Sequence, residues 1–385
     1  MGEGITATAQ ALSIEELSLR FWRNIPELVL EPHPAFNVFH GENAQGKTNL
    51  LEAIYVIARL KTFREARLAQ LVTHGEAAGR VAAKVRRAGV TQSVEVSVID
   101  GHRRVRVDGK GIGRISDHGR HYKVVLFTPE DIYLARGAPG ARRQFLDRAL
   151  FNLEPAFLAD AQDWKKLLRN RNALLKQGAA NGTGPGFWES VEAYDEVLTA
   201  VGARIATRRQ ALVHSLSERM GGVWERVFGG QADISLRYES TVPGVMEGAS
   251  LEEVTTAYAE RLTETRSADL RRGATGTGPH LDDIVAMLEG RPIREHGSQG
   301  QNRVMVLALK VTEIQLVIEQ TGIRPILLLD DVSSELDRKR NGQLFDYLDE
   351  IRGQVFLTTT APDLVGLSVD RAEFEVEAGN VCRSS

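Results

Sequence analysis

One short segment constrains the fold of this chain more than any other: Gly41-Glu42-Asn43-Ala44-Gln45-Gly46-Lys47-Thr48. It fits the phosphate-binding pattern G-x-x-x-x-G-K-[ST], in which two glycines let the backbone curl so that successive N–H groups point at phosphate oxygens. Lys47 brings a positive charge to the β- and γ-phosphates, and the Thr48 hydroxyl is a ligand for Mg²⁺. All eight residues are therefore candidates for binding a nucleoside triphosphate with Mg²⁺.

The residues around this loop supply the strand–loop–helix context that the pattern requires. Phe36–His40 is typical of a short strand, and apolar residues recur at helical spacing after the loop. Far along the chain, Ile326–Asp330 has the apolar run of a parallel strand buried on both faces. We expect Asp330, at its end, to hold Mg²⁺, and Asp331 to orient or deprotonate the attacking water.

The periodic segments predict an α/β fold in two parts. Alternating residues over positions 80–107 are typical of antiparallel strands, whereas positions 141–175 and Phe187–Phe228 are long amphipathic helical stretches. A β-α-β pattern returns toward the C-terminus. The predicted boundaries are residues 1–130 and 273–385 for a nucleotide-binding domain, and 131–272 for a mainly helical second lobe inserted into it.

Charge excludes one class of protein. The 385 residues carry a net charge of −3, so the chain is not a uniformly basic nucleic-acid binder, and any DNA contact must come from local patches. Each patch, taken alone, is better explained as a solvated face or as structural ion pairs. The candidate patches are Lys61/Arg64/Arg67, Arg103/Arg104/Arg106, Arg142/Arg143, Lys165/Lys166/Arg169/Arg171, Arg204/Arg208/Arg209 and Arg271/Arg272.

The sequence also bears on location. No segment approaches the ~20 apolar residues of a membrane span, and the first ten residues lack the basic and apolar regions of a signal peptide. The single cysteine, Cys382, fits a reducing compartment. We therefore expect a cytoplasmic protein without membrane contact.

A second anion site is indicated at the start of a later helix, where the sequence is Ser298-Gln299-Gly300-Gln301. A serine hydroxyl and backbone N–H groups at a helix N-terminus bind anions. Because the chain already has one phosphate loop, a second γ-phosphate site is best explained by a homodimer, in which this helix end meets the nucleotide held by the partner. An ordinary helix N-cap is the alternative.

In this order and spacing, the motifs resemble the bacterial RecF family, which belongs to the ATP-binding-cassette ATPases of the SMC type. The resemblance covers about residues 12–360. The stretches that carry it are residues 21–24, 41–54, 128–131, 142–147, 171–175, 278–283, 298–303, 327–332, 334–337 and 358–360. It implies a cassette-type ATPase domain like the SMC head, with an inserted helical lobe.

The resemblance also implies roles for matching residues. The residues implied for catalysis are Lys47, Asp331 and Ser298, and those implied for the metal are Thr48 and Asp330. The residues implied to bind nucleotide outside the phosphate loop are Ser298, Gly300, Gln301, Asp337 and Thr359. Asp337 would couple the two sites of a dimer. Asp331 stands where other cassettes have a glutamate, and Thr359 near the position of their switch histidine, so slow hydrolysis is expected.

By the same resemblance, the protein would bind ATP and Mg²⁺ and act in DNA replication, recombinational repair and the SOS response to DNA damage. ATP would close a homodimer on double-stranded DNA near a single-strand gap. Weak, DNA-stimulated hydrolysis would release the DNA, while the RecO and RecR proteins load the RecA recombinase.

Three other classes share part of this pattern. A transporter cassette would share the ATP motifs, but the sequence has no membrane segment. A cassette-type ATPase with nuclease activity would need a further metal-binding carboxylate cluster, for which Asp282-Asp283 is a loose candidate. A chromosome-organising SMC protein would need a long heptad coiled coil, and the predicted insert is too short and is interrupted at residues 182–186.

Overall fold

The computed structural model describes residues 9–64, 66–332, 338–361 and 370–384, and the chain divides into two compact units. Unit 1 comprises the described parts of Met1–Asp131, Val223–Gly230 and Val306–Ser385, and unit 2 comprises Ile132–Gly222 and Gln231–Met305. The first boundary lies one residue from the predicted one, but unit 2 extends to Met305 instead of ending at residue 272. The reason is strand pairing, because β10 (Asp283–Leu288) pairs with β9 (Ile234–Glu239) inside unit 2.

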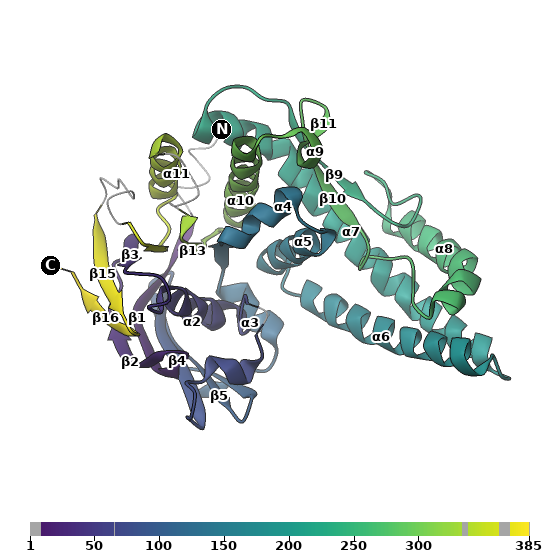
Figure 1. Ribbon diagram of the computed structural model, residues 1–385, viewed down its shortest axis with the longest axis horizontal. Coiled ribbons are helices and arrows are strands. Elements are labelled where there is room, and N and C mark those ends of the chain that lie inside the picture. The colour runs from purple at the N-terminus through teal and green to yellow at the C-terminus, as the bar shows by residue number, and fades with distance from the viewer. Residues whose placement is uncertain (1–8, 65, 333–337, 362–369, 385) are drawn as a thin grey trace. The chain divides into compact units, whose positions relative to one another are not determined.

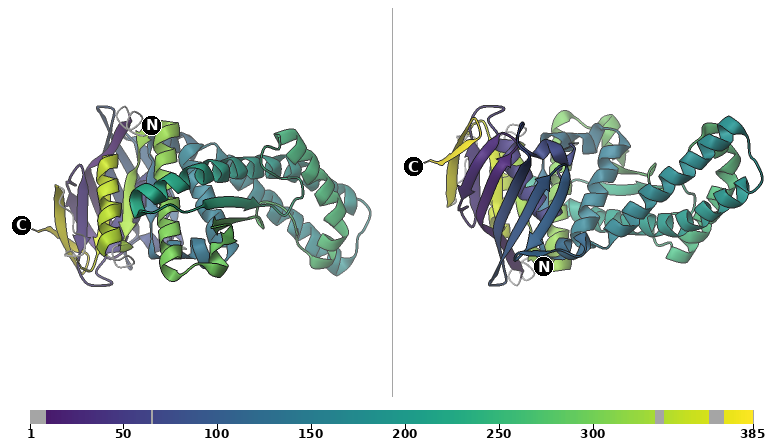
Figure 2. Two further views of the ribbon diagram at one scale, coloured as in Figure 1. Left: turned by 90° about the horizontal axis from the view of Figure 1, so that it is seen from above. Right: turned by 90° about the horizontal axis from the view of Figure 1, so that it is seen from below.

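The first sheet of unit 1 is largely antiparallel and has the order β12-β1-β4-β5-β6-β7, with β2 also paired to β1. Its strands are β1 (Gln10–Trp22), β2 (Ile25–Leu30), β4 (Ala78–Arg87), β5 (Val90–Ile99), β6 (His102–Val107), β7 (Lys110–Gly111) and β12 (Ile323–Arg324). Its long strands lie side by side in the right-hand view of Figure 2. The turns after β4 and β5 have positive φ at both central residues, as tight hairpins require.

The second sheet of unit 1 has the order β16-β15-β3-β14-β13-β8. Its strands are β3 (Phe36–His40), β8 (Val124–Phe127), β13 (Ile326–Asp330), β14 (Val355–Thr359), β15 (Arg371–Glu377) and β16 (Asn380–Arg383). All are parallel except β16. Every residue of β13 is buried, as its apolar run predicts. The carboxyl ends of β3, β8, β13 and β14 therefore meet at one edge, where α/β proteins bind ligands.

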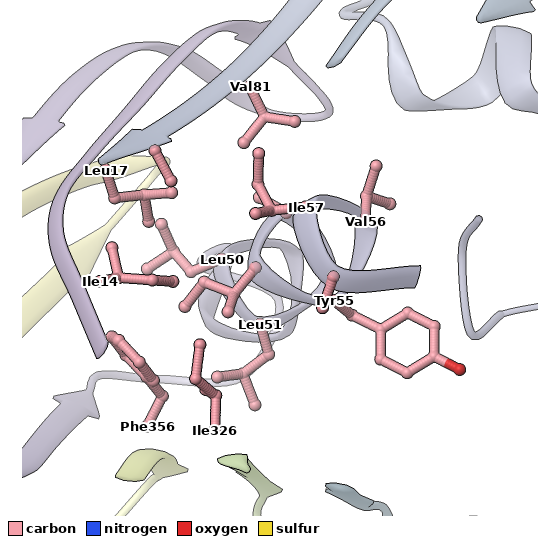
Figure 3. Close-up of a cluster of buried hydrophobic side chains, with 14 of the residues drawn as sticks. Ile14, Leu17, Leu50, Leu51, Tyr55, Val56, Ile57, Val81, Ile326 and Phe356 are labelled. Atoms are coloured by element: carbon pink, nitrogen blue, oxygen red, sulfur yellow. The ribbon is translucent and has the colours of Figure 1, made fainter. Parts of the chain in front are cut away.

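Helix α2 (Lys47–Arg59) lies between the two sheets (Figure 3). Leu50, Leu51 and Ile57 belong to a core that also contains Ile14 of the first sheet and Phe356 of the second. Eleven of its 13 residues are buried, which explains why its sequence is apolar nearly all round. In the part of unit 1 that the structure describes, the other α-helices are α3 (Ile115–His121) and α11 (Arg338–Ile351), together with parts of α7 and α10.

Unit 2 is mainly helical, with a small sheet of order β11-β10-β9 (Figure 1). Its helices are α4 (Tyr133–Arg136), α5 (Pro139–Leu153), α6 (Phe157–Asn181), most of α7 (Phe187–Phe228), α8 (Leu251–Arg272), α9 (Ile293–His296) and the start of α10 (Gln299–Thr321), and β11 is Arg291–Pro292. The predicted helical stretch 141–175 is two helices, because Pro155 interrupts it. Within the described ranges, no helix has both the length and the apolar character needed to cross a membrane.

Candidate nucleotide site

The phosphate loop connects β3 to α2 and requires glycine at both ends. Gly41 and Gly46 have φ values of 148° and 118°, which side chains disfavour. A Cβ at position 41 would lie 2.3 Å from the carbonyl oxygen of Val376, and one at position 46 would lie 2.8 Å from the side-chain amide of Asn24. Both the backbone conformation and the surrounding packing therefore require glycine at positions 41 and 46.

Lys47, the first residue of α2, folds its side chain back over the loop. Its Nζ donates to the carbonyl oxygens of Gly41 at 2.5 Å and Glu42 at 2.6 Å, and only 7% of the residue is exposed. Burial lowers the pKa of Lys47, and the negative charges of Asp331 and Asp330 oppose that shift. The ammonium group is thus held at the loop, in the field of the two predicted aspartates.

The two predicted metal ligands are in contact. The Thr48 hydroxyl donates to Oδ1 of Asp330 at 2.8 Å, and the Thr358 hydroxyl donates to the same oxygen at 2.7 Å, because β14 places Thr358 beside Asp330. Burial raises the pKa of Asp330, and these two hydrogen bonds oppose the shift. A hydroxyl and a carboxylate this close suit Mg²⁺, which takes few protein ligands and completes its octahedron with water and phosphate oxygens.

Asp331 and Thr359 reach the same sheet edge. Asp331 has a positive φ of 49°, and its N–H donates to Oγ1 of Thr358 at 3.0 Å. Thr359, at the end of β14, pairs with His40, the residue before the loop, and its hydroxyl accepts a hydrogen bond from the Ala361 N–H at 3.1 Å. Asp337, which the resemblance implies as the coupling residue, lies outside the described residues.

Sequence reasoning missed the residues that brace the loop. Nδ2 of Asn24, in the turn between β1 and β2, donates to the carbonyl oxygen of Gln45 at 3.0 Å. The turn between β15 and β16 binds the same residue, since the Ala378 N–H donates to Oε1 of Gln45 at 2.6 Å and the Gly379 N–H donates to its carbonyl oxygen at 2.9 Å. Residues 21–24 contribute to the family resemblance, but that resemblance indicated no role for Asn24.

A buried ion pair ties α2 to the turn between β1 and β2. Nε and Nη2 of Arg23 donate to the two carboxylate oxygens of Glu52 at 2.7 and 2.9 Å, and Glu52 is fully buried. The Thr62 hydroxyl also donates to Glu52. Because a bidentate pair fixes orientation as well as distance, the loop is anchored through its helix in addition to the direct contacts of Asn24.

Ser298 caps helix α10 within unit 2. The Gln301 N–H donates to the Ser298 hydroxyl at 3.2 Å, and the Ser298 N–H donates to Oε1 of Gln301 at 2.8 Å, which together form a capping box. In the single chain, Ser298 is therefore an ordinary helix N-cap, which is the alternative interpretation of this segment. Ser298 is exposed, and the cap leaves its hydroxyl proton able to reach an anion. Its role in a partner's site stays a prediction, as do those of Gly300 and Gln301.

The structure separates the basic patches into two kinds. Arginines in structural ion pairs are Arg142 with Asp283, Arg171 with Asp195 and Asp269, Arg204 and Arg208 with Asp160, and Arg209 with Asp147. Exposed basic residues with no acidic partner within the described part of the chain include Lys165, Lys166 and Arg169 on α6, Arg104 on β6 and Arg271 on α8. The second group offers charge to a polyanion.

The carboxylates of Asp282 and Asp283 have structural partners. Oδ2 of Asp282 accepts from the Tyr238 hydroxyl at 2.6 Å and Oδ1 accepts from the Thr241 N–H at 2.8 Å, whereas both oxygens of Asp283 accept from Arg142, at 2.6 and 2.7 Å. Among the residues that the structure describes, no group of three or more His, Cys, Asp and Glu could hold a metal ion. The nuclease alternative therefore gains no support from this pair.

Comparison with known proteins gives consistent similarities. The family described as RecF/RecN/SMC N terminal domain matches residues 13–372. The chain is 36% identical over 375 residues to the DNA replication and repair protein RecF of Geotalea daltonii, across 96% of this chain and 100% of that protein. It is 40% identical over 372 residues to the protein of that name from Myxococcus xanthus, across 95% and 96%. A solved structure described as the recombination mediator protein RecF-ATP in the RecFOR pathway matches with a TM-score of 0.87 at 30% identity, across 97% of this chain and 98% of that chain.

Proposed function

Because the chain belongs to the RecF family, within the wider RecF/RecN/SMC group, we propose that it is an ATP-dependent DNA-binding protein of DNA replication and recombinational repair. The expected fold class, a cassette-type ATPase domain like the SMC head with an inserted helical lobe, is confirmed. The observation that supports the function best is the 2.8 Å contact between Thr48 and Asp330, which joins the phosphate loop to the acidic strand end.

The loop binds the triphosphate of ATP. Backbone N–H groups of residues 41–48 cradle the phosphates, and Lys47 exchanges its two carbonyl partners for phosphate oxygens. Thr48 and Asp330 would hold Mg²⁺, which would supply positive charge for the phosphate oxygens. Asp331 orients the attacking water, and its short side chain supports slow hydrolysis because a carboxylate farther from the water gives less help.

In this proposal, ATP binding closes a homodimer of the chain. Ser298, with Gly300 and Gln301, presents a helix N-terminus and an exposed hydroxyl to the γ-phosphate held by the partner's loop. The γ-phosphate is the group that both copies share, so hydrolysis removes the link between them and releases the dimer. DNA that stabilises the closed dimer stimulates hydrolysis by increasing the population of complete sites.

Double-stranded DNA near a single-strand gap is the proposed ligand of the closed dimer, and RecO and RecR are its proposed partners in loading RecA. The cations Lys165, Lys166 and Arg169 of α6 support a phosphate contact in unit 2. Replacing Lys165 and Lys166 with Gln should weaken binding to all DNA sequences alike and reduce the salt slope of log Kobs by about 0.9 per lost contact. An unchanged salt slope would show that Lys165 and Lys166 do not contact DNA phosphates.

The first test is the solution mass of the wild type and of Asp331→Asn, with and without Mg-ATP, measured by light scattering. We expect monomers without ATP, a dimer with it, and a longer-lived dimer for Asp331→Asn, which keeps the loop but loses the carboxylate. Lys47→Arg should prevent the ATP-bound dimer. If the mass of all three proteins is the same with and without ATP, the ATP-closed dimer is refuted, whereas nucleotide binding is not.

A further inference from the structure

Two side chains of unit 2 converge on the backbone just before helix α10. Nδ2 of Asn302 donates to the carbonyl oxygens of Gly297 at 2.9 Å and Ser298 at 2.7 Å. Nη2 of Arg136 donates to the carbonyl oxygen of Gly297 at 3.0 Å. Three side-chain N–H···O bonds therefore hold the carbonyl groups of two consecutive residues, in addition to the capping box.

Asn302 is buried at the start of α10. It is fully buried, and it lies four residues after Ser298, one helical turn along α10. Its own N–H donates to the Ser298 carbonyl at 3.0 Å, the first intrahelical bond after the cap. The side chain and the backbone of one residue thus hold the peptide that carries the Ser298 side chain.

The backbone next to Arg136 is held by Arg142, which belongs to a buried ion pair. The carbonyl oxygen of the next residue, Gly137, accepts from Nη1 of Arg142 at 2.7 Å, and Arg142 makes its buried bidentate pair with Asp283 of β10. The Arg136 side chain is itself exposed, and its hydrogen bond is to the carbonyl oxygen of Gly297. The Asp283–Arg142 pair therefore fixes the backbone from which Arg136 reaches the start of α10.

We propose that Arg136 and Asn302 are positioning residues that set the direction in which Ser298 presents its hydroxyl to the nucleotide of a second copy of the chain. This inference rests on the proposed function, because it adds two residues to the site that Ser298 contributes in trans. It also gives the Asp282-Asp283 segment a purpose other than metal binding, since Asp283 supports the same helix end through Arg142 and Arg136.

The test compares Arg136→Ala with Arg291→Ala in the full-length protein. Both remove one exposed arginine from unit 2, but Arg291 lies in β11 and, within the described part of the chain, makes no hydrogen bond or ion pair with the start of α10. Loss of one hydrogen bond per site corresponds to about fivefold, and a dimer with two such sites to about 25-fold. We expect the dimer dissociation constant in Mg-ATP, from sedimentation equilibrium, to rise by that factor for Arg136→Ala and to stay unchanged for Arg291→Ala.

A double-mutant cycle distinguishes positioning from a separate contact. If Arg136 acts through Ser298, the double variant with Ser298→Ala should dimerise no more weakly than Ser298→Ala alone. Fully additive effects would overturn the proposal, and so would an equal loss of nucleotide affinity in monomeric Arg136→Ala. If Ser298→Ala itself leaves dimerisation unchanged, the trans role in the proposed function fails instead.

Asn302→Ala provides a second route to the same conclusion. Because Asn302 is buried, its thermal unfolding is measured first, and the variant is used only if it remains folded at the assay temperature. We then expect a weaker ATP-bound dimer that is again non-additive with Ser298→Ala. A folded Asn302→Ala protein that dimerises like the wild type would contradict the positioning role, whatever the result for Arg136→Ala.

Discussion

We expect the buried imidazole of His118 to make the free energy of unfolding of unit 1 depend on pH. Its Nε2–H donates to the carbonyl oxygen of Ile57 in α2 at 2.7 Å, and its ring centroid lies 4.3 Å from that of Tyr122. Nδ1 is buried and has no hydrogen-bond partner within the described residues. Burial lowers the pKa of His118 from 6.5 to about 4, and the hydrogen bond to Ile57 opposes the shift only in part.

The sign of the effect follows from proton binding. Between pH 6.5 and about 4 the unfolded chain holds a proton on His118 that the folded chain does not, so the free energy of unfolding decreases as the pH falls through this window. At 1.36 kcal/mol per pKa unit, the loss is about 3 kcal/mol over the whole window and about 2 kcal/mol by pH 5. Above pH 6.5 the contribution is constant.

The assay is urea unfolding of the wild type and His118→Gln between pH 7.5 and 5, followed by tryptophan fluorescence. Glutamine keeps an N–H donor for Ile57 but does not titrate, so carboxylate effects common to both proteins cancel in the difference. We expect the wild type to lose about 2 kcal/mol more than His118→Gln between pH 7.5 and 5. His296→Gln, at an exposed position, is the control. Parallel pH profiles for wild type and His118→Gln would refute the reasoning.

Three further predictions concern the nucleotide site. Gly46→Ala should reduce ATP affinity by more than 100-fold in calorimetry, roughly 3 kcal/mol, because its Cβ has neither space nor an allowed φ; near-normal affinity would contradict this. Thr358→Val removes a hydrogen bond to Asp330, so about tenfold more Mg²⁺ should be needed for tight ATP binding, and an unchanged titration would argue against this role. Glu52→Ala leaves Arg23 without its buried partner and should destabilise the protein by about 3 kcal/mol in urea unfolding; a loss below about 1 kcal/mol would show that the pair is dispensable.

The parts of the site that could be predicted from sequence are those encoded within a few residues. The phosphate loop depends on local glycines and on a strand and a helix that flank it, and the strand Ile326–Asp330 is recognisable from its apolar run alone. The contact of Thr48 with Asp330 also follows, because parallel strands bring their carboxyl ends to one edge.

The missing parts depend on contacts between distant segments. Nothing local in Asn24 indicates that its amide binds Gln45, because that contact exists only once β1, β3 and β15 are in place. Unit 2 continues past residue 272, the predicted end of the second lobe, because β10 pairs with β9, and this pairing of distant segments has no local signal in the sequence. Ser298 shows a different limit, because one serine–glutamine pattern encodes both a helix cap and a candidate anion site.

The turn between β15 and β16 has a practical consequence for handling the protein. Ala378 and Gly379 hold Gln45 in the middle of the phosphate loop, although more than 300 residues separate them along the chain. Proteolytic trimming or a shortened expression clone that lost residues 371–384 would therefore look like a harmless tail deletion and yet impair the nucleotide site.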